Sequence, residues 1–344
     1  MRVSYSPGYY VSLPEGHPFP MGKFPALHRI LRREGLLRPR DVLEPGRAPW
    51  TDLLLVHTPG YLARLERGTL GRRAERRMGL PWSRGLVRRS RLAVQGTVEA
   101  ARMALRDGIA ANLAGGTHHA FPDRGEGYCV LNDVAVAARL LRLSGEARRI
   151  LVLDLDVHQG NGTAAVLGEE AGVTTFSLHA EKNYPWRKVP STRDAALPDR
   201  TGDRAYLQAL AAELPPLLGA ARPDLVFYLA GVDPVAGDRY GRLSLTREGL
   251  RRRERLVLRT MRRRGVPVTL LLSGGYASSP EATADLHAEA HRAAAEVHGV
   301  EPGRAAAGTP PEGSEPKRES TSTGSPGGTE CTESTIRGSA ARAS

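Results

Sequence analysis

The segment Ile150-Leu-Val-Leu-Asp-Leu-Asp-Val-His-Gln-Gly-Asn-Gly162 decides the fold, because an unbroken apolar run passes directly into polar residues. A short continuous apolar run is typical of a strand that is buried on both faces of a parallel sheet. In the polar part, Asp154, Asp156 and His158 are spaced by two, so an extended backbone places their side chains on one side. Two carboxylates and an imidazole suit a divalent metal. The alternative is a turn and a helix cap, in which Asp and Asn bond backbone N–H groups.

Similar apolar runs alternate with helical patterns along the rest of the chain. The predicted strands are Arg2–Tyr5, Asp52–Val56, Ile109–Leu113, Arg149–Asp154, Val173–Leu178, Leu225–Ala230 and Val266–Leu272. The predicted helices include Leu92–Leu105, Asp133–Leu143, Arg204–Leu218, Leu245–Arg264 and Glu281–Val297. This alternation predicts an α/β protein with a mostly parallel sheet that is covered by helices on both faces. In that architecture, ligands bind at the carboxyl ends of the strands.

Polar residues follow three other predicted strands at the point where each strand ends. His118 and His119 come after the strand that starts at Ile109, Asp233 follows Ala230, and Tyr276 follows Leu272. Asp233 can supply a third metal ligand, and three N/O ligands with an open position are typical of a catalytic zinc site. Glycines flank each of these residues and allow the backbone to turn sharply near a ligand.

The histidine pair predicts acid–base chemistry if a turn aims both rings inward. Adjacent residues of an extended chain face opposite ways, and Gly115-Gly116 permits the turn that His118 and His119 need. Two imidazoles beside a metal-bound water fit general base and general acid roles. The Tyr276 hydroxyl is suited to donating to an oxyanion. The structural alternatives are one histidine bonded to a backbone carbonyl with the other exposed, and a plain Gly-Gly-Tyr turn.

Charge is the most unusual feature of the composition. The chain has 344 residues with 49 Lys and Arg against 37 Asp and Glu, a formal net charge of +12. One basic run consists of Arg72, Arg73, Arg76, Arg77, Arg84, Arg88, Arg89 and Arg91, and a second spans Arg251 to Arg264. Both runs lie on segments away from the strand-end motifs and read as solvated helix faces. Without interleaved aromatic residues they do not predict nucleic-acid binding, but they can influence encounter with acidic surfaces or anionic substrates.

The two cysteines, Cys129 and Cys331, exclude a disulfide scaffold and a cysteine-based structural zinc site. The N-terminal segment has no apolar h-region and the sequence has no run of 18 apolar residues, so we expect a cytoplasmic protein without membrane contact. From Glu301 to Ser344, 25 of 44 residues are Gly, Ser, Thr or Pro. That composition predicts a disordered tail after a catalytic domain of residues 1–300.

Five short motifs, taken together and in order, resemble the zinc-dependent histone deacetylase family. They are Gly116-Thr-His-His-Ala120, Gly127-Tyr-Cys-Val-Leu-Asn-Asp133, Asp154-Leu-Asp-Val-His-Gln-Gly-Asn-Gly-Thr163, Gly231-Val-Asp-Pro234 and Gly274-Gly-Tyr276. His17-Pro-Phe-Pro-Met21 and Asn183-Tyr-Pro-Trp186 make the chain most similar to the class IV branch and its bacterial relatives. The resemblance covers residues 1 to about 300. It implies the arginase–deacetylase fold, a single parallel sheet of about eight strands with helices on both faces.

The resemblance also implies a role for each matching residue. The metal ligands would be Asp156, His158 and Asp233, and the metal would be zinc or ferrous iron. His119 would be the general base and then acid, with His118 as its electrostatic partner and Tyr276 bonded to the substrate carbonyl. Asp154 would orient His118, and Asn161 would orient His119. A structural potassium ion would lie by Asp154, Asp156, His158 and Ser177, and the substrate tunnel would be lined by Gly127, Tyr128, Tyr184 and Trp186.

One departure from the family pattern is Asn161, because many relatives carry Asp there. A neutral amide leaves His119 less basic, which alters how the two histidines share the proton work.

The leading hypothesis is therefore a zinc-dependent amidohydrolase that acts on acyl-lysine in proteins or peptides. The runner-up is a hydrolase of acetylpolyamines or other small acylated amines, although Asp238-Arg-Tyr240 offers no clear acidic gate for a polyamine. A non-catalytic acyl-lysine reader is a third possibility, yet His118, His119 and Tyr276 are all present. An arginase-like enzyme with two manganese ions needs a further acid where this chain has Gly160. The sequence does not predict the oligomeric state.

Overall fold

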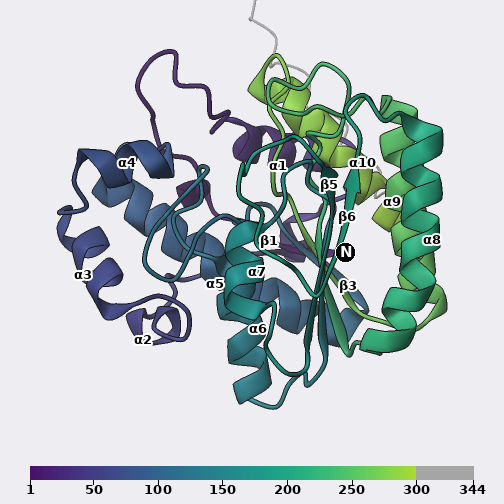
Figure 1. Ribbon diagram of the computed structural model, residues 1–344, viewed down its shortest axis with the longest axis horizontal. Coiled ribbons are helices and arrows are strands. Elements are labelled where there is room, and N and C mark those ends of the chain that lie inside the picture. Colours follow the sequence, from purple (N-terminus) through teal and green to yellow (C-terminus); the bar gives the residue numbers. More distant parts are fainter. Residues whose placement is uncertain (300–344) are drawn as a thin grey trace, which may run out of the picture. The chain divides into compact units, whose positions relative to one another are not determined.

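The computed structural model describes residues 1–299, which contain one parallel sheet of eight strands (Figure 1). The strands are β1 (Arg2–Ser4), β2 (Val42–Leu43), β3 (Ile109–Asn112), β4 (Ile150–Asp154), β5 (Val173–Ala180), β6 (Arg193–Leu197), β7 (Leu225–Leu229) and β8 (Val268–Leu271). Their order in the sheet is β2-β1-β3-β8-β7-β4-β5-β6, and every neighbouring pair is parallel. The predicted fold class, a single parallel sheet of about eight strands, is confirmed.

Helices cover both faces of this sheet (Figure 1). They are α1 (Lys23–Arg33), α2 (Trp50–Leu53), α3 (Pro59–Arg67), α4 (Arg72–Met78), α5 (Arg84–Asp107), α6 (Asp133–Leu143), α7 (Asn161–Leu167), α8 (Asp203–Ala221), α9 (Arg247–Arg263) and α10 (Pro280–His298). The 3-10 helices Pro7–Tyr9 and Pro39–Asp41 complete the described elements.

The alternation of side chains along each strand builds two separate hydrophobic cores. In β4, Leu151 and Leu153 pack into the core beneath α1, α8, α9 and α10, whereas Ile150 and Val152 pack into the core formed with α5 and α6. Successive side chains of a strand point to opposite faces, so an unbroken apolar run is what a sheet covered on both faces requires.

One predicted strand is wrong. Asp52–Val56 lies in and just after the short helix α2, which follows Pro49. Leu53 and Val56, three residues apart, are buried, while Leu54 between them is 48% exposed, a helical pattern of burial. A short apolar run alone does not distinguish a buried strand from a helix.

The sequence analysis also missed the two edge strands, β2 and β6. β2 has only two residues, and β6 is largely exposed and begins with Arg193 and Asp194. Edge strands are covered on fewer sides, so they lack the apolar run that identified the central strands.

The predicted tail, 301–344, and Cys331 lie outside the described residues, and the predicted domain boundary at residue 300 stays a prediction. Over residues 1–299, no helix is long and apolar enough to cross a membrane.

Candidate functional site

The four strands that end in polar motifs are consecutive neighbours in the sheet, in the order β3, β8, β7, β4. Their last residues are also in register, because Asn112 pairs with Leu271, Leu271 with Leu229, and Leu229 with Asp154. Parallel strands in register deliver the chain segments that follow them to one edge of the sheet. This is why motifs that lie more than 150 residues apart, such as His118 and Tyr276, meet in one site.

The segment after β4 bends instead of staying extended. β4 ends at Asp154, and residues 156–158 form a bend. Asp156 donates its backbone N–H to Asp154 Oδ1 at 3.1 Å, and His158 donates its backbone N–H to Asp156 Oδ1 at 3.0 Å. The predicted extended backbone is therefore wrong beyond Asp154, because carboxylates that bond the backbone two residues ahead turn the chain. The turn still brings Asp156 and His158 into the same site.

Asp156, His158 and Asp233 form a compact buried group whose ligand atoms all lie within 4.8 Å of one another. The Nδ1 atom of His158 is 3.0 Å from Asp156 Oδ1 and 3.2 Å from Asp233 Oδ2. The backbone holds the other carboxylate oxygens, since Gly274 donates its N–H to Asp156 Oδ2 at 2.6 Å and Val157 donates to Asp233 Oδ1 at 2.9 Å. One atom of each of the three residues thus lies near a common point, and of the carboxylate oxygens there Asp233 Oδ2 is the one with no hydrogen-bond partner among the described residues.

The electrostatics of this group favour a cation at that point. Asp233 Oδ2 is buried and accepts no hydrogen bond with good geometry from a described residue. Burial and the charge of Asp156 raise the pKa of Asp233 to about 7, which shows how poorly two bare carboxylates tolerate each other there. One imidazole and two carboxylates are the donor set that zinc and ferrous iron accept. The residues present therefore fit a divalent metal.

Glycine is required beside this group. A Cβ atom on Gly274 would lie 2.0 Å from Asp233 Oδ2 and 2.6 Å from Asp156 Oδ2, well inside van der Waals contact. Only a residue without a side chain lets the backbone N–H approach Asp156 this closely.

The histidines at 118 and 119 both face the group, as the predicted turn requires. The turn is closed by a hydrogen bond from the His118 N–H to the Gly116 carbonyl at 3.0 Å, with Gly116 at φ 77°. The His118 Nδ1 atom is 2.7 Å from Asp154 Oδ2, and the His119 Nδ1 atom is 2.6 Å from Asn161 Oδ1. The two ring centroids are 4.1 Å apart.

The environment drives the pKa values of the two histidines in opposite directions. Burial lowers the pKa of His118, but the carboxylates of Asp154 and Asp156 outweigh it and raise that pKa to about 9. For His119, burial and the positive charge of His118 hold the pKa well below its usual value. At neutral pH the pair therefore consists of one charged and one neutral imidazole, the division of labour that acid–base catalysis needs.

Glu126 is a neighbour of the site that the sequence analysis missed. Its Oε1 atom accepts a hydrogen bond from Asn161 Nδ2 at 3.3 Å and from the Tyr184 hydroxyl at 2.5 Å. The first bond fixes the orientation of the Asn161 amide, so that Oδ1 faces His119. The available signal was that Glu126 comes directly before Gly127, the first residue of the Gly127–Asp133 motif.

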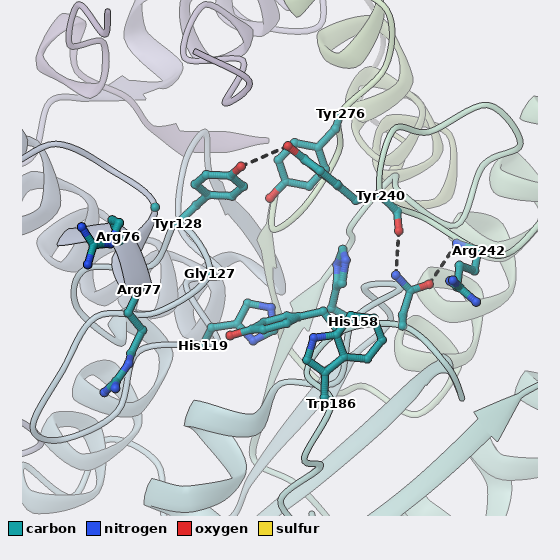
Figure 2. Close-up of a pocket in the computed structure, with 13 residues that line it drawn as sticks. Arg76, Arg77, His119, Gly127, Tyr128, His158, Trp186, Tyr240, Arg242 and Tyr276 are labelled. Carbon is teal, nitrogen blue, oxygen red and sulfur yellow. Dashed lines mark hydrogen bonds between the residues drawn. The ribbon is translucent and has the colours of Figure 1, made fainter. Parts of the chain in front are cut away.

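Above the group lies an open pocket of about 400 Å³ (Figure 2). Its walls combine aromatic rings with the two site histidines and three arginines. The lining residues are Arg76, Arg77, Gly79, His119, Gly127, Tyr128, His158, Asn183, Tyr184, Trp186, Tyr240, Arg242 and Tyr276. The tunnel residues named in the sequence analysis are thus all in the wall, while Tyr240 and Asn183 were not predicted there.

The aromatic rings hold one another in place. The hydroxyl groups of Tyr128 and Tyr240 share a hydrogen bond of 3.1 Å, and the Tyr276 ring meets the Tyr240 ring edge-on at 4.9 Å (Figure 2). Gly127, at φ 53°, lies directly against His119, because a Cβ atom there would be 2.7 Å from His119 Cδ2. A side chain at this position would displace the imidazole.

The arginines at the pocket mouth overturn one expectation. We expected both basic runs to lie away from the strand-end motifs, yet Arg76 and Arg77 of the first run, on α4, line the pocket. Arg242, which belongs to neither run, lines it from the segment after β7. Not every arginine of the first run is at the pocket. Arg89, for example, is buried and donates to the Tyr9 carbonyl. Distance along the sequence said nothing about which arginines the fold brings to the site.

Beneath the group lies a second missed residue, Lys23. It is 2% exposed, and its ammonium group donates to the Ser273 carbonyl at 3.0 Å. Burial lowers its pKa to about 8. Lys23 lines a small cavity of about 40 Å³ together with His118, Asp156 and Tyr276, and the sequence signal was the neighbouring motif that ends at Met21.

Ser177 lies on β5 directly opposite Asp154 in the register of the sheet. Its hydroxyl is 3.0 Å from His179 Nδ1, and the residue is 2% exposed. Ser177 thus lies beside Asp154, as in the potassium site that the resemblance implies. The potassium site itself stays a prediction.

Comparisons with known proteins agree with this geometry. Residues 17–293 match the sequence profile of the Histone deacetylase domain. The chain is 48% identical over 296 residues to an uncharacterized protein of Picosynechococcus sp., which covers 86% of this chain and 99% of that protein. It is 31% identical to Histone deacetylase 2 of Arabidopsis thaliana (81% and 75% covered) and 32% identical to a probable deacetylase of Methanothermobacter thermautotrophicus (82% and 87% covered). Among solved structures, a histone deacetylase homologue complexed with SAHA superposes with a TM-score of 0.73 at 26% identity, covering 88% of this chain and 84% of that one.

Proposed function

Because this chain belongs to the histone deacetylase family, a family of deacetylase-type hydrolases, we propose that it is a metal-dependent deacylase that hydrolyses the amide of acetyl- or acyl-lysine in a protein or peptide. The observation that carries the proposal is the buried group of Asp156, His158 and Asp233 at the base of an aromatic pocket, with His119 and Tyr276 in the pocket wall. A metal, a base and an oxyanion donor around one open space are what amide hydrolysis requires.

Asp156, His158 and Asp233 would hold the metal, for which we propose zinc. When bound, such a metal supplies Lewis-acid polarisation of the amide carbonyl and lowers the pKa of water toward about 7. A potassium ion by Asp154, Asp156, His158 and Ser177 would stiffen the same loop, and we carry that site as part of the proposal.

His119 is the general base. With Nδ1 donating its proton to Asn161 Oδ1, the Nε2 atom of the neutral ring is left free to take a proton from water. The low pKa of His119 keeps the ring neutral at the start of the reaction. Asn161 and Glu126 together fix the ring orientation that this step needs.

His118 keeps its proton because Asp154 holds it at 2.7 Å. Its positive charge stabilises the negative charge that develops as the amide is attacked. After attack, the proton gained by His119 passes to the leaving amine.

Tyr276 is the hydrogen-bond donor to the substrate carbonyl oxygen. Burial and the nearby carboxylates of Asp156 and Asp233 raise its pKa well above the usual value, so the hydroxyl keeps its proton throughout. Its backbone N–H donates to Asp238 Oδ2 at 2.7 Å, which anchors the residue at the pocket wall. The rings of Tyr128 and Tyr184, with Gly127, would enclose the aliphatic stem of the acyl-lysine.

Acyl-lysine is preferred over acetylpolyamine because of the charges near the pocket. A polyamine is cationic along its length, and the titratable side chains of the wall other than the histidines and tyrosines are arginines. The nearby acids are engaged, since Asp238 accepts N–H groups from Tyr240, Gly241 and Tyr276, and Glu126 accepts from Tyr184 and Asn161.

The test is hydrolysis of a fluorogenic acetyl-lysine peptide by His119→Ala and Tyr276→Phe. We expect each variant to lose about 10²- to 10⁴-fold in kcat, the range for removal of a general base or of an oxyanion donor. Neither residue is proposed as a metal ligand, so the metal content of the purified protein should be unchanged. Chelation should abolish wild-type turnover, and zinc or ferrous iron should restore it. Wild-type turnover in both variants would refute the mechanism.

A further inference from the structure

Two groups of arginines face each other across the pocket mouth. Arg76 and Arg77 come from the C-terminal part of α4, whereas Arg242 comes from the segment between β7 and α9. Figure 2 shows Arg76 and Arg77 on one side of the pocket and Arg242 on the other, with Tyr128, Trp186 and Tyr276 between them. The mouth therefore carries positive charge on two opposite sides.

This charge is largely free to act on a substrate. Arg76 and Arg77 are exposed, and neither makes an ion pair with any of residues 1–299. The one acid of α4, Glu75, accepts the backbone N–H of Trp82 at 3.2 Å. Arg242 pairs with Asp199 at 2.8 Å but is still 49% exposed, so water and ions reach its guanidinium. Exposed guanidinium groups keep their charge at every physiological pH and bind carboxylates through paired hydrogen bonds.

The space between the arginines has the opposite character. Its wall is built from tyrosines and Trp186, and Trp186 is 79% exposed at the mouth. An aromatic passage suits the aliphatic stem of an acylated lysine, and the arginines lie at its mouth rather than between its rings. The anionic groups of a substrate would therefore lie outside, on either side of the entering side chain.

We propose that this enzyme selects acyl-lysine residues flanked on both sides by Asp or Glu in a peptide that crosses the pocket mouth. The proposal rests on the deacylase function and names its substrate class. Cations on one side only would suit a small anionic amine, whereas cations on both sides suit a chain with acids before and after the acyl-lysine. The formal charge of +12 adds long-range attraction for such a substrate and opposes lysine-rich ones.

The test compares three fluorescein-labelled acetyl-lysine peptides whose flanking residues are all Glu, all Gln or all Arg. For the wild type at low salt, we expect kcat/KM to be roughly tenfold higher or more for the Glu peptide than for the Arg peptide. This difference should arise from KM, with kcat nearly the same for the two peptides. At about 1 M salt, where the screening length is about 3 Å, most of that difference should disappear.

The informative variant is Arg76→Gln/Arg77→Gln. It should lower kcat/KM for the Glu peptide by about 5- to 10-fold, since an exposed ion pair contributes up to about fivefold, and leave the Gln peptide within about twofold. The matched control is Arg262→Gln/Arg263→Gln, which removes the same charge from exposed positions at the end of α9. These residues precede β8 and so lie at the other edge of the sheet from the pocket. The control should keep the full preference for Glu.

Three results would overturn the inference. They are equal kcat/KM of the wild type for the three peptides, an unchanged preference in the α4 variant, and the same loss of preference in the control, which would assign the effect to net charge.

Fluorescence anisotropy of the same peptides separates the inference from the deacylase function. If no peptide is hydrolysed, the deacylase function fails. Tighter binding of the Glu peptide that depends on Arg76 and Arg77 would then still support the inference, and equal binding would overturn it.

Discussion

Two arginine-rich helices of this protein place the same side chain in opposite electrostatic environments. α9 carries arginine at most turns, and its neighbour α10 supplies carboxylates to them. α4 has four arginines in seven residues, and none of them makes an ion pair with a described residue. The difference lies in what packs beside each helix, because composition and spacing look alike in the sequence. The comparison teaches that arginines are neutralised where acidic side chains pack against their helix, as on α9, and keep their charge unpaired among the described residues where none do, as on α4.

The pairing on α9 is extensive and partly buried. Glu289 of α10, 1% exposed, accepts from Arg247, Arg251 and Arg292 at 2.6 to 2.9 Å. Asp285 pairs with Arg247 and Arg292, and Glu296 pairs with Arg255 and Arg259. α9 thus contributes to the stability of the α9–α10 layer.

The largest effect on stability should come from the one fully buried arginine of α9. Arg253 is 0% exposed, donates to Glu254 Oε1 at 2.5 Å and to the Leu155 carbonyl at 3.2 Å. Arg253→Met leaves the Glu254 carboxylate buried with only the Tyr228 hydroxyl as donor, at 2.6 Å. Loss of one partner of a buried ion pair costs about 3–5 kcal/mol, so urea unfolding should show a loss in the free energy of unfolding of that size.

The double variant Arg253→Met/Glu254→Gln is the control for this prediction. It removes both charges, and replacement of a whole buried pair is often close to neutral. Recovery of most of the lost stability would assign the effect to the unpaired carboxylate. If the double variant is as unstable as the single one, packing or the contact with Leu155 is responsible instead.

The next effect should come from Glu289→Gln, which leaves Arg247, Arg251 and Arg292 without their shared carboxylate. Because these arginines are partly exposed, we expect a loss of about 1–2 kcal/mol in the free energy of unfolding at pH 7. Burial raises the pKa of Glu289, but hydrogen bonds from Arg251 and Arg247 outweigh it and place the pKa below its ordinary value. A carboxyl with a lowered folded-state pKa stabilises the protein above the unfolded pKa, near 4.5, and that contribution is lost as the pH falls through the folded pKa.

The pH dependence sharpens this prediction. The wild type should lose stability steeply on acidification below about pH 4.5, and the Glu289→Gln variant should lose less over the same range, because its amide does not titrate. Urea midpoints measured from pH 7 down to the acid transition give the comparison. Parallel curves for the two proteins would show that the Glu289 carboxyl does not contribute through its charge.

The central fold could be predicted because it depends on patterns that are local in the sequence. The apolar runs of β3, β4, β5, β7 and β8 reflect burial on both faces, and α6 was predicted with its observed bounds, Asp133–Leu143. The edge strand β6 and the helix α2 escaped prediction because exposure and shortness remove the periodic signal.

The candidate site divides in the same way. Its strand-end residues could be predicted, since a parallel sheet delivers Asp156, Asp233 and Tyr276 to one edge. The sequence analysis missed Glu126 and Lys23, because their contacts with the site depend on the paths of loops that carry no pattern in the sequence. The bend after Asp154 is an intermediate case, because the aspartates that suggested a metal also turn the chain.

The arginines of α4 could not be placed from the sequence at all. Gly127 donates its N–H to the Arg77 carbonyl at 3.2 Å, and Tyr128 donates to the Met78 carbonyl at 2.8 Å. These backbone contacts hold the end of α4 against Gly127 and Tyr128, which line the pocket. The spacing of residues 72–78 and 127–128 does not predict these contacts. The sequence analysis therefore interpreted this run as a solvated helix face, whereas the structure places its end at the pocket mouth.

The smallest effect on stability is expected for the arginines of α4. Arg76→Gln/Arg77→Gln should change the free energy of unfolding by less than about 0.5 kcal/mol. Loss of two cations from the last turn weakens the interaction with the helix dipole, but it also relieves like-charge repulsion with Arg72 and Arg73, four residues earlier. The matched variant on α9, Arg247→Gln/Arg251→Gln, should lose about 1–2 kcal/mol because it breaks the bonds to Glu289. Urea unfolding of the two variants decides the comparison. If the α4 variant loses as much as the α9 variant, its arginines have stabilising partners, and their charge is not free for a substrate.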